Sequence, residues 1–555
     1  MRIITTETEA FQGWDSIANA CIAMGPKRVL RSVTIGAYLS QNDNGGLFLG
    51  DQCHNYCNHH LLVRILARSW LDNPTIEDSG VTLQNDEISI LQSILRQINE
   101  LVGHKLELGS DLIASVDSFE RRRNRALPIL LEMYLALRRR IDPIRSNVAR
   151  AWYFIRTGQQ STDARIKKSV ADLGRPLMDT VFHSIERYLF HYLAVFVSRG
   201  WIDDVYTKFS SVGTRGQIDA LLGWYCKDMD SVVGDWESIK AFPFRGLESP
   251  FSRDPICRMG DVLVAPDPGA LFSGLLERMI LELSCEFSGD TKKESIARTL
   301  VGYLLEDYVG MLLGNIQSES DGPAVLRSFQ YQDGNDTLDS PDFFVVDGGI
   351  VVIEVKASRM PFPIPLPDVE GLYKEWLREV CGARADRRPL RQFHKFIRSW
   401  VRNNSEIRSQ VGAFPGLVRL VYLIVCPEDV PFFTNSMYFR HGRLPDGFEG
   451  GVSVLADRTL VISMHDLEVL CRVALLGRRG GGVFHLVDEY AEYLRDSNGL
   501  TMNGDTDAKA VLPRLAEYLT MRFPEHAKAK PDLLSDVFKE ATDRAIREVF
   551  RRDDA

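Results

Sequence analysis

The first half of the chain has the hydrophobic spacing of amphipathic helices. In residues 88–104, apolar side chains recur every three or four positions and form one stripe, made of Ile88, Leu91, Ile94, Leu95, Ile98 and Leu101. The same spacing predicts further helices at about 118–140, 143–157, 164–198 and 215–226. We therefore expect residues 1–245 to form a mainly helical N-terminal domain.

The pattern changes after a proline-rich stretch at residues 241–270. Proline removes a backbone donor and breaks helices, so this stretch predicts a domain boundary. A helical run from about 275 then gives way to four strand-like segments, at 325–332, 340–347, 349–357 and 417–426, with an arginine-rich helical stretch at about 370–403 before the last. This order predicts an α/β domain at 275–484, with a mixed central sheet flanked by helices. A helical C-terminal segment is expected at 485–555.

Composition excludes several classes of protein. Of the 555 residues, 45% are hydrophobic and 25% are charged, which rules out a mainly disordered or low-complexity chain. No apolar run approaches the roughly 18 residues that span a bilayer, and the N-terminus lacks the apolar core of a secretory signal. We expect a cytoplasmic protein that has no membrane partner.

The cysteines indicate buried thiols rather than a disulfide framework. Their number, 9, is odd, and they are scattered among apolar neighbours. One cluster, CHNYCNHH, brings together five side chains of zinc-ligand type, Cys53, His54, Cys57, His59 and His60. A structural zinc site needs a second ligand pair at a recognised spacing, so the favoured alternative is a helix start with a buried cysteine and exposed histidines.

The candidate chemistry lies in the strand pair at residues 340–358. Most of this segment is β-branched or aromatic, yet it contains Asp342, Glu354 and Lys356. Charged side chains are seldom buried unless they are paired or bind a metal. Glu354 and Lys356 are two positions apart, so they are expected to project from the same face of one strand.

Loop length decides whether Asp342 and Glu354 meet. A three-residue loop at 347–349 would pair Val346 with Ile350 and, in the same register, would place Asp342 opposite Glu354 with Cβ atoms about 5 Å apart. A two-residue loop would instead turn Glu354 to the other face of the sheet. Two carboxylates at this separation repel each other unless a cation lies between them or one is protonated.

At these residues the sequence resembles the PD-(D/E)XK nuclease superfamily. The pattern consists of Pro341-Asp342 followed by Glu354-Val355-Lys356. The family also has a helix with a glutamate before the strands, which GYLLEDYVG matches through Glu306, with Asp307 as its competitor. RPLRQFHKFIRSW and LVRLVYLIVC match the helix and buried strand that follow the lysine. The resemblance covers about residues 280–470.

The resemblance implies a role for each group. One or two Mg²⁺ ions, or Mn²⁺ in their place, would be held by oxygen atoms of Asp342, Glu354, the Val355 backbone carbonyl and Glu306. Lys356 would orient the attacking water and offset the charge that builds on the phosphate. The helix after the strands would contact the substrate through Arg388, Arg391, Gln392, Lys395 and Arg398.

The implied function is metal-dependent hydrolysis of phosphodiester bonds, in DNA in preference to RNA, by an endonuclease rather than an exonuclease. By resemblance, such chains act in restriction, anti-phage defence or repair. Two alternatives stay open. The strand pair could be an exposed edge hairpin whose charges are solvated. Otherwise, a nuclease-like scaffold could bind nucleic acid or assemble without catalysis.

Charge is distributed unevenly along the chain. The formal net charge of −9 does not suggest a nucleic-acid-binding protein, but residues 119–168 contain 13 Lys and Arg against four acidic residues. This stretch fits either a phosphate-binding surface or a solvated helix face, and the N-terminal domain could equally bind a protein partner or a second copy of the chain. A second run, 378–408, has nine Lys and Arg against three acidic residues, and its position after Lys356 favours it as the substrate contact.

Overall fold

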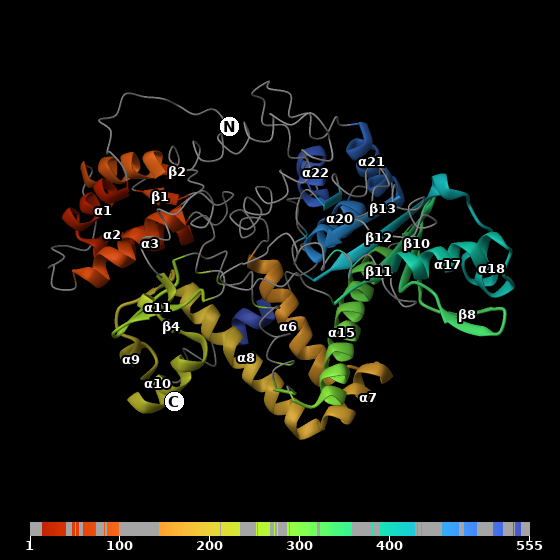
Figure 1. The fold of residues 1–555 in the computed structure, drawn as a ribbon, viewed down its shortest axis with the longest axis horizontal. Coiled ribbons are helices and arrows are strands. Elements are labelled where there is room, and N and C mark those ends of the chain that lie inside the picture. The colour runs from red at the N-terminus through yellow and green to blue at the C-terminus, as the bar shows by residue number, and fades with distance from the viewer. Residues whose placement is uncertain are drawn as a thin grey trace. The chain divides into compact units, whose positions relative to one another are not determined.

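The computed structural model describes residues 14–39, 47–49, 52–54, 59–73, 86–98, 144–210, 213–233, 254–266, 289–318, 322–357, 389–427, 458–476, 482–496, 514–525 and 539–544, with a few single residues and the pairs 286–287 and 434–435 between these ranges. The chain divides into two compact units. The first contains residues 1–152, 181–279 and 536–555, and the second contains residues 153–180 and 280–535. Figure 1 labels all the helices named below and most of the strands.

The first unit has a helical core near the N-terminus. Three helices pack together with a short antiparallel hairpin: α1 (Trp14–Ala23), α2 (Pro26–Leu39), α3 (His59–Asp72), β1 (Leu47–Leu49) and β2 (Gln52–His54). Residues 86–98 form the helix predicted from the apolar stripe, which is buried at Leu91, Ile94, Leu95 and Ile98. The helical prediction is confirmed for these segments. The helix predicted at 118–140 lies outside the described residues.

The cysteines follow the expectation where they are described. Buried thiols are found at Cys21, Cys226, Cys257, Cys426 and Cys471. Burial raises the pKa of the Cys21 thiol to about 12, so it is protonated at neutral pH. In the CHNYCNHH cluster, Cys53 lies in β2 and His59 begins α3, whereas Cys57 falls outside the described residues.

The rest of the first unit combines helices with a small sheet. The helices are α8 (Arg175–Val197), α9 (Val205–Lys208), α10 (Arg215–Tyr225) and α11 (Met229–Val233). Of α8, only the part from residue 181 onward belongs to this unit. The sheet has the order β3-β6-β5-β4, formed by β3 (Trp201–Ile202), β6 (Val262–Val264), β5 (Cys257–Met259) and β4 (Lys227–Asp228). β5 and β6 lie inside the proline-rich stretch, and Cys257, Leu263 and Val264 are fully buried. This part of the stretch therefore belongs to a core and is not a linker.

The second unit is built on a five-stranded mixed sheet. Its order is β13-β12-β11-β10-β7, formed by β13 (Thr459–Ser463), β12 (Leu420–Cys426), β11 (Ile350–Val355), β10 (Phe343–Val346) and β7 (Ala324–Arg327). β10 is antiparallel to both β7 and β11, whereas β11, β12 and β13 run parallel. Every residue of these three parallel strands is buried, as expected for strands covered on both faces. The prediction of a mixed central sheet flanked by helices is therefore confirmed.

Helices cover this sheet. α15 (Thr291–Gln317) packs on β7 and β11, and α20 (Met464–Leu476) packs on β12 and β13. α21 (Val483–Asp496) contacts β10, β11 and β12, and α22 (Leu515–Arg522) packs on α20 and α21. α17 (Pro389–Val401) rests on the sheet through aromatic rings: Phe393 stacks on Tyr422 with centroids 4.0 Å apart, and Phe396 lies 5.3 Å from Phe344.

The strands differ from the prediction in two places. Residues 325–332 do not form one strand, because β7 ends at Arg327 and β8 (Gln330–Asp333) pairs with β9 (Asp336–Asp339) in a separate hairpin. The break occurs at Phe329, whose backbone N–H and C=O both bond to Ser340. β13 was not predicted from the sequence.

The β8–β9 hairpin is held by the start of α18 (Ser405–Val411). Asn404 and Glu406 bond the backbone of Gln332 in β8.

The units also differ from the predicted domain boundaries. α7 (Ala164–Leu173) and residues 153–160 of α6 (Ile144–Gln160) belong to the second unit, where α7 packs along α15 through Ile166, Val170 and Leu173. α21 and α22 also belong to the second unit, whereas residues 536–555 belong to the first. None of the helices within the described ranges is both long and apolar enough to cross a membrane.

Candidate active site

The hairpin between β10 and β11 has the predicted three-residue loop. Val346 pairs with Ile350 and Phe343 pairs with Ile353. The loop is closed by a 2.9 Å hydrogen bond from the N–H of Asp347 to the carbonyl of Gly349, and Gly348 adopts a φ of +68°, which glycine accepts without strain. Continued by one residue, this register places Asp342 opposite Glu354. The register prediction is confirmed, and the two-residue loop is excluded.

The hydrogen-bond pattern brings these two side chains close together. Bonded pairs alternate with non-bonded pairs along an antiparallel ladder, and the bond from Asp347 to Gly349 fixes which pairs are bonded. Counting from that pair, residues 342 and 354 form a non-bonded pair, in which side chains approach most closely. The geometry therefore sets two carboxylates side by side.

The backbone of Val355 ends the ladder in an unusual way. Lys356 donates its N–H to Val425 on β12 (2.9 Å), so the preceding residue, Val355, directs its N–H and C=O toward β10. The opposing residue there is Pro341, which has no N–H to donate. The Val355 N–H is satisfied by Oδ2 of Asp342 at 2.7 Å. The Val355 carbonyl receives no ladder bond from Pro341, which is the property that a backbone metal ligand needs.

Residues 340 and 341, between β9 and Asp342, lie outside the strands and are held in place by hydrogen bonds of Ser340. The hydroxyl of Ser340 accepts the N–H of Phe329 (2.9 Å) and donates to the carbonyl of Pro341 (3.0 Å). The Nε2 of Gln392 on α17 lies 3.4 Å from the carbonyl of Asp339, to which it donates. Gln392 therefore reaches the chain three residues before Asp342.

Glu354 is buried and only partly satisfied. The residue is 3% exposed, and its Oε1 accepts a hydrogen bond from the Nζ of Lys356 at 2.7 Å. Its Oε2 is also buried and has no hydrogen-bond partner among the described residues. An edge hairpin with solvated charges is therefore excluded, because β11 is the central strand of the sheet and its glutamate is out of contact with water.

The titratable groups influence one another. Burial raises the pKa of Asp342 well above its usual range, and the nearby carboxylates of Glu354 and Glu306 raise it further. Burial also raises the pKa of Glu306, against the lowering effect of Arg165. Burial opposes the charged form of Lys356, but the attraction of Glu354, Asp342 and Glu306 holds its pKa above the usual value. The three carboxylates thus share one electrostatic environment with the lysine.

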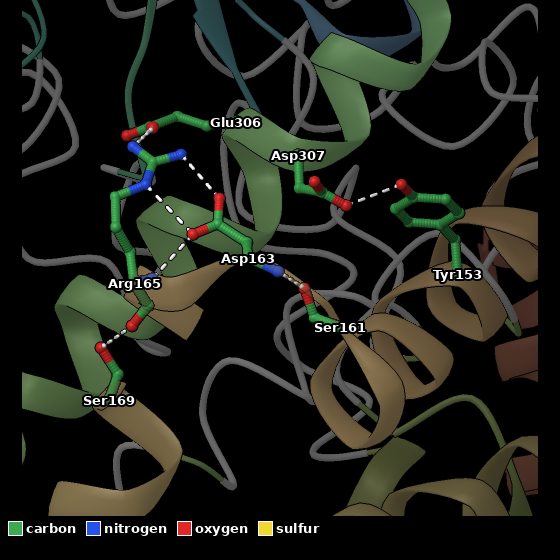
Figure 2. Close-up of polar contacts among 7 residues, drawn as sticks. All are labelled: Tyr153, Ser161, Asp163, Arg165, Ser169, Glu306 and Asp307. Atoms are coloured by element: carbon green, nitrogen blue, oxygen red, sulfur yellow. Dashed lines mark hydrogen bonds and ion pairs between the residues drawn. The ribbon is translucent and has the colours of Figure 1, made fainter. Parts of the chain in front are cut away.

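Glu306, rather than Asp307, belongs to this environment. The Oε2 of Glu306 pairs with the guanidinium of Arg165 on α7 at 2.7 Å. Asp307 instead accepts a 2.8 Å hydrogen bond from the hydroxyl of Tyr153 on α6. Figure 2 shows the two carboxylates directed to these separate partners. The choice of Glu306 over its neighbour is thus supported by the structure.

The predicted substrate-contacting residues lie on one side of α17. The opposite side is buried, through Leu390, Phe393, Phe396, Ile397 and Trp400. Arg391, Gln392 and Lys395 are partly exposed and Arg398 is exposed, whereas Arg388 lies outside the described residues. The positions that are described therefore form a polar helix face, and Gln392 is the member that the structure connects to the strand before Asp342.

Sequence reasoning missed Arg165 as a neighbour of the site. It was counted within the basic stretch of the N-terminal domain, yet α7 belongs to the unit of the sheet. The separation of 141 residues between Arg165 and Glu306 leaves no local signal of their contact. Another residue of that basic stretch, Arg150, is 2% exposed and donates a hydrogen bond to Asn147. Arg150 therefore fits neither a solvated helix face nor a phosphate-binding surface.

The oxygen atoms at the site fit a hard divalent cation. Asp342, Glu354 and Glu306 offer carboxylates, and Val355 offers a carbonyl, which is the donor set that Mg²⁺ and Mn²⁺ prefer. The buried, unpartnered Oε2 of Glu354 is the atom that such an ion would satisfy. Within the described ranges, however, no three His, Cys, Asp or Glu side chains already converge as a metal-binding group. In the structure, Lys356 and Arg165 neutralise two of the carboxylates.

Comparison with known proteins adds no relative. The chain matches no protein-family model, no curated protein and no solved structure.

Proposed function

We propose that the chain is a metal-dependent nuclease that hydrolyses phosphodiester bonds, with DNA as the preferred substrate. One observation carries this proposal. The buried Glu354 lies across the strand pair from Asp342, and it pairs one oxygen with Lys356 while the other has no partner among the described residues. A buried carboxylate pair beside a lysine is costly to fold, so it is expected to serve a purpose other than stability. The resemblance to the PD-(D/E)XK pattern supports the same reading.

The side chains have distinct tasks in this proposal. Asp342, Glu354 and the Val355 carbonyl would hold the ion, with Glu306 as a further ligand. When bound, Mg²⁺ supplies polarisation of the phosphate and a water of lowered pKa. The ion pair with Glu354 uses one of the three N–H donors of Lys356, so the ammonium keeps donors for a phosphate oxygen or the attacking water. Its raised pKa keeps it charged for that task.

A second candidate is a nucleic-acid-binding protein without catalysis. It is favoured by the existing pairing of Glu354 with Lys356 and of Glu306 with Arg165, and by the lack of a converged metal-binding group within the described part of the chain. In that case the lysine and arginine would serve only to balance the carboxylates, and no metal would be required.

Cleavage assays separate the two candidates. Supercoiled plasmid, linear duplex and single-stranded RNA would be incubated with the protein in Mg²⁺, Mn²⁺ or chelator. We expect metal-dependent nicking of the closed plasmid, which an exonuclease cannot perform, and weaker action on RNA. Asp342→Asn, Glu354→Gln and Lys356→Ala should each lower the rate at least about 100-fold.

The matched control is Asp339→Asn, three residues before Asp342. Asp339 lies in β9, and its side chain bonds Gln330, so the variant removes a nearby carboxylate without touching the site. Metal-dependent cleavage that survives all three site substitutions would exclude this site. Binding to every substrate with no cleavage in any metal would favour the non-catalytic candidate.

A further inference from the structure

Arg165 is fixed in place by three partners from two helices. Asp163, at the N-cap of α7, accepts the Arg165 backbone N–H (2.7 Å) and pairs with its guanidinium (3.0 Å). The guanidinium lies over the ring of Tyr303 on α15 at 4.7 Å and reaches Oε2 of Glu306 at 2.7 Å. Figure 2 shows the guanidinium between the carboxylates of Asp163 and Glu306. The side chain is therefore held in one orientation.

Among the residues that the structure describes, this arrangement leaves part of the guanidinium without a contact. Its contacts with Asp163 and Glu306 involve three of the five N–H donors of an arginine. The Arg165 side chain is 41% exposed, compared with 19% for Glu306, so the remaining donors are accessible from solvent. The pair is only partly exposed, so it also contributes to holding α7 on α15. A pre-oriented guanidinium with further N–H donors is in addition the arrangement that recognises phosphate.

The charge of the site becomes less negative when a divalent ion binds. In their ionised forms, Asp342, Glu354, Glu306 and Asp163 contribute −4, and Lys356 and Arg165 contribute +2, which leaves −2. One divalent cation would bring the sum to zero and so remove the net repulsion of a phosphate. α7 adds positive charge of its own, since Lys167 and Lys168 are exposed on the helix whose apolar side packs on α15.

We propose that Arg165 binds a phosphate group of the nucleic-acid backbone beside the metal site, and that α7 thereby forms part of the substrate surface. This inference rests on the proposed function and extends it. It assigns the contact to a helix that lies outside the strand motif and outside α17.

The test measures nucleic-acid binding without cleavage. Affinity of a fluorescent duplex of about 25 base pairs would be measured in Mg²⁺ at several salt concentrations, in the Lys356→Ala background, which keeps the proposed metal ligands. Each phosphate contact contributes about 0.9 to the slope of log affinity against log salt. We expect Arg165→Gln to lower the slope by about that amount and to weaken binding about 3- to 10-fold, while Arg165→Lys restores the slope because it keeps the charge.

Arg298→Gln is the matched control. Arg298 lies on α15 two turns before Glu306, is 72% exposed and pairs with Glu294, so its loss should leave the slope unchanged. An unchanged slope in Arg165→Gln would overturn the inference, and a lower melting temperature with an unchanged slope would assign Arg165 a structural role only. Failure of the Lys356→Ala parent and of the wild type in Mg²⁺ to bind DNA or RNA at any salt concentration would instead overturn the proposed function, and this inference with it.

Discussion

Glu306 and Asp307 are consecutive residues of α15 whose carboxylates bind different helices, Arg165 of α7 at 2.7 Å and Tyr153 of α6 at 2.8 Å. Neighbouring positions on a helix point about 100° apart, so only one of the two can face the strand pair. The pKa of Glu306 responds to Glu354 and Lys356, which places Glu306 on that side. Asp307 instead joins the contact between α15 and α6.

These neighbours provide a direct test of the site. Glu306→Gln removes a charged ligand and should weaken both Mn²⁺ binding and Mg²⁺-dependent cleavage about 10-fold or more. Asp307→Asn keeps an oxygen that can accept the Tyr153 hydroxyl, so cleavage should stay within about twofold of the wild type. Titration calorimetry and plasmid nicking would measure the two effects. A larger loss in Asp307→Asn would reverse the assignment.

The crowding of carboxylates should be visible in the stability of the metal-free protein. Asp342 is held near Glu354 and Glu306, and its raised pKa means that ionisation is unfavourable in the folded state. Asp342→Asn should therefore stabilise the metal-free protein at pH 7 by on the order of 1 kcal/mol. Mg²⁺ should raise the melting temperature of the wild type but not of this variant. The exposed Asp339→Asn should change neither, and equal destabilisation by both variants would argue against crowding.

His191 should give the first unit an acid-sensitive stability. It is 7% exposed, stacks on Tyr225 at 5.1 Å and donates from Nδ1 to the carbonyl of Arg187. Burial lowers its pKa to about 4 from 6.5, so the folded state holds the neutral form. Stability should fall by up to about 1.4 kcal/mol per pH unit as the pH drops from 6.5 toward 4, where only the unfolded state takes up the proton.

Denaturant unfolding between pH 4.5 and 7.5 measures this dependence. His191→Gln should flatten the curve over that interval, because no imidazole remains to be protonated on unfolding. The control is His485→Gln on α21, a histidine that is exposed. Identical pH curves for the wild type and His191→Gln would refute the assignment.

The buried carboxylate of Glu186 should depend on Arg544. Glu186 is 3% exposed and pairs with Arg544 at 3.0 Å, and the guanidinium also lies over the rings of Trp152 and Phe190. Arg544→Ala should destabilise the first unit by about 1–3 kcal/mol, since the buried carboxylate loses a charged partner and keeps His183, 3.3 Å from its other oxygen. Adding Glu186→Gln should recover part of the loss. Thermal unfolding of the single and double variants, with exposed Lys539→Ala as control, would reveal whether the two residues are coupled.

The hairpin that sets the site register should tolerate little change at Gly349. A Cβ atom there would lie 2.5 Å from ring atoms of Phe484 on α21. Gly349→Ala should cost about 1–3 kcal/mol of unfolding free energy through overpacking, and Phe484→Leu should relieve part of it. Gly302→Ala, within α15 where a Cβ meets nothing within 4 Å, should instead stabilise by up to about 1 kcal/mol. Denaturant unfolding would show whether the two alanine substitutions change the unfolding free energy in opposite directions.

Local rules explain what could be predicted from the sequence. The Asp342–Glu354 pairing followed from the two-residue period of a strand and a loop of fixed length, and both are properties of 19 consecutive residues. The break of the predicted strand at Phe329 could not be foreseen, because it coincides with hydrogen bonds to Ser340, 11 residues further along the chain. Arg165 was missed because its neighbour Glu306 is 141 residues away. Tertiary contacts, rather than local preference, decided these cases.

The packing of α7 on α15 constrains the order in which the chain can fold. A ribosome releases α7 more than a hundred residues before α15, and residues 181–279, which join the other unit, are made in between. The apolar face of α7 therefore stays exposed during synthesis until α15 has been made. Closing a loop of this length costs conformational entropy, which is offset only when α15 and the sheet have packed. A fragment that starts at residue 280 would never recover α7. It would expose the side of α15 that α7 covers, and it should aggregate rather than yield an isolated, active unit.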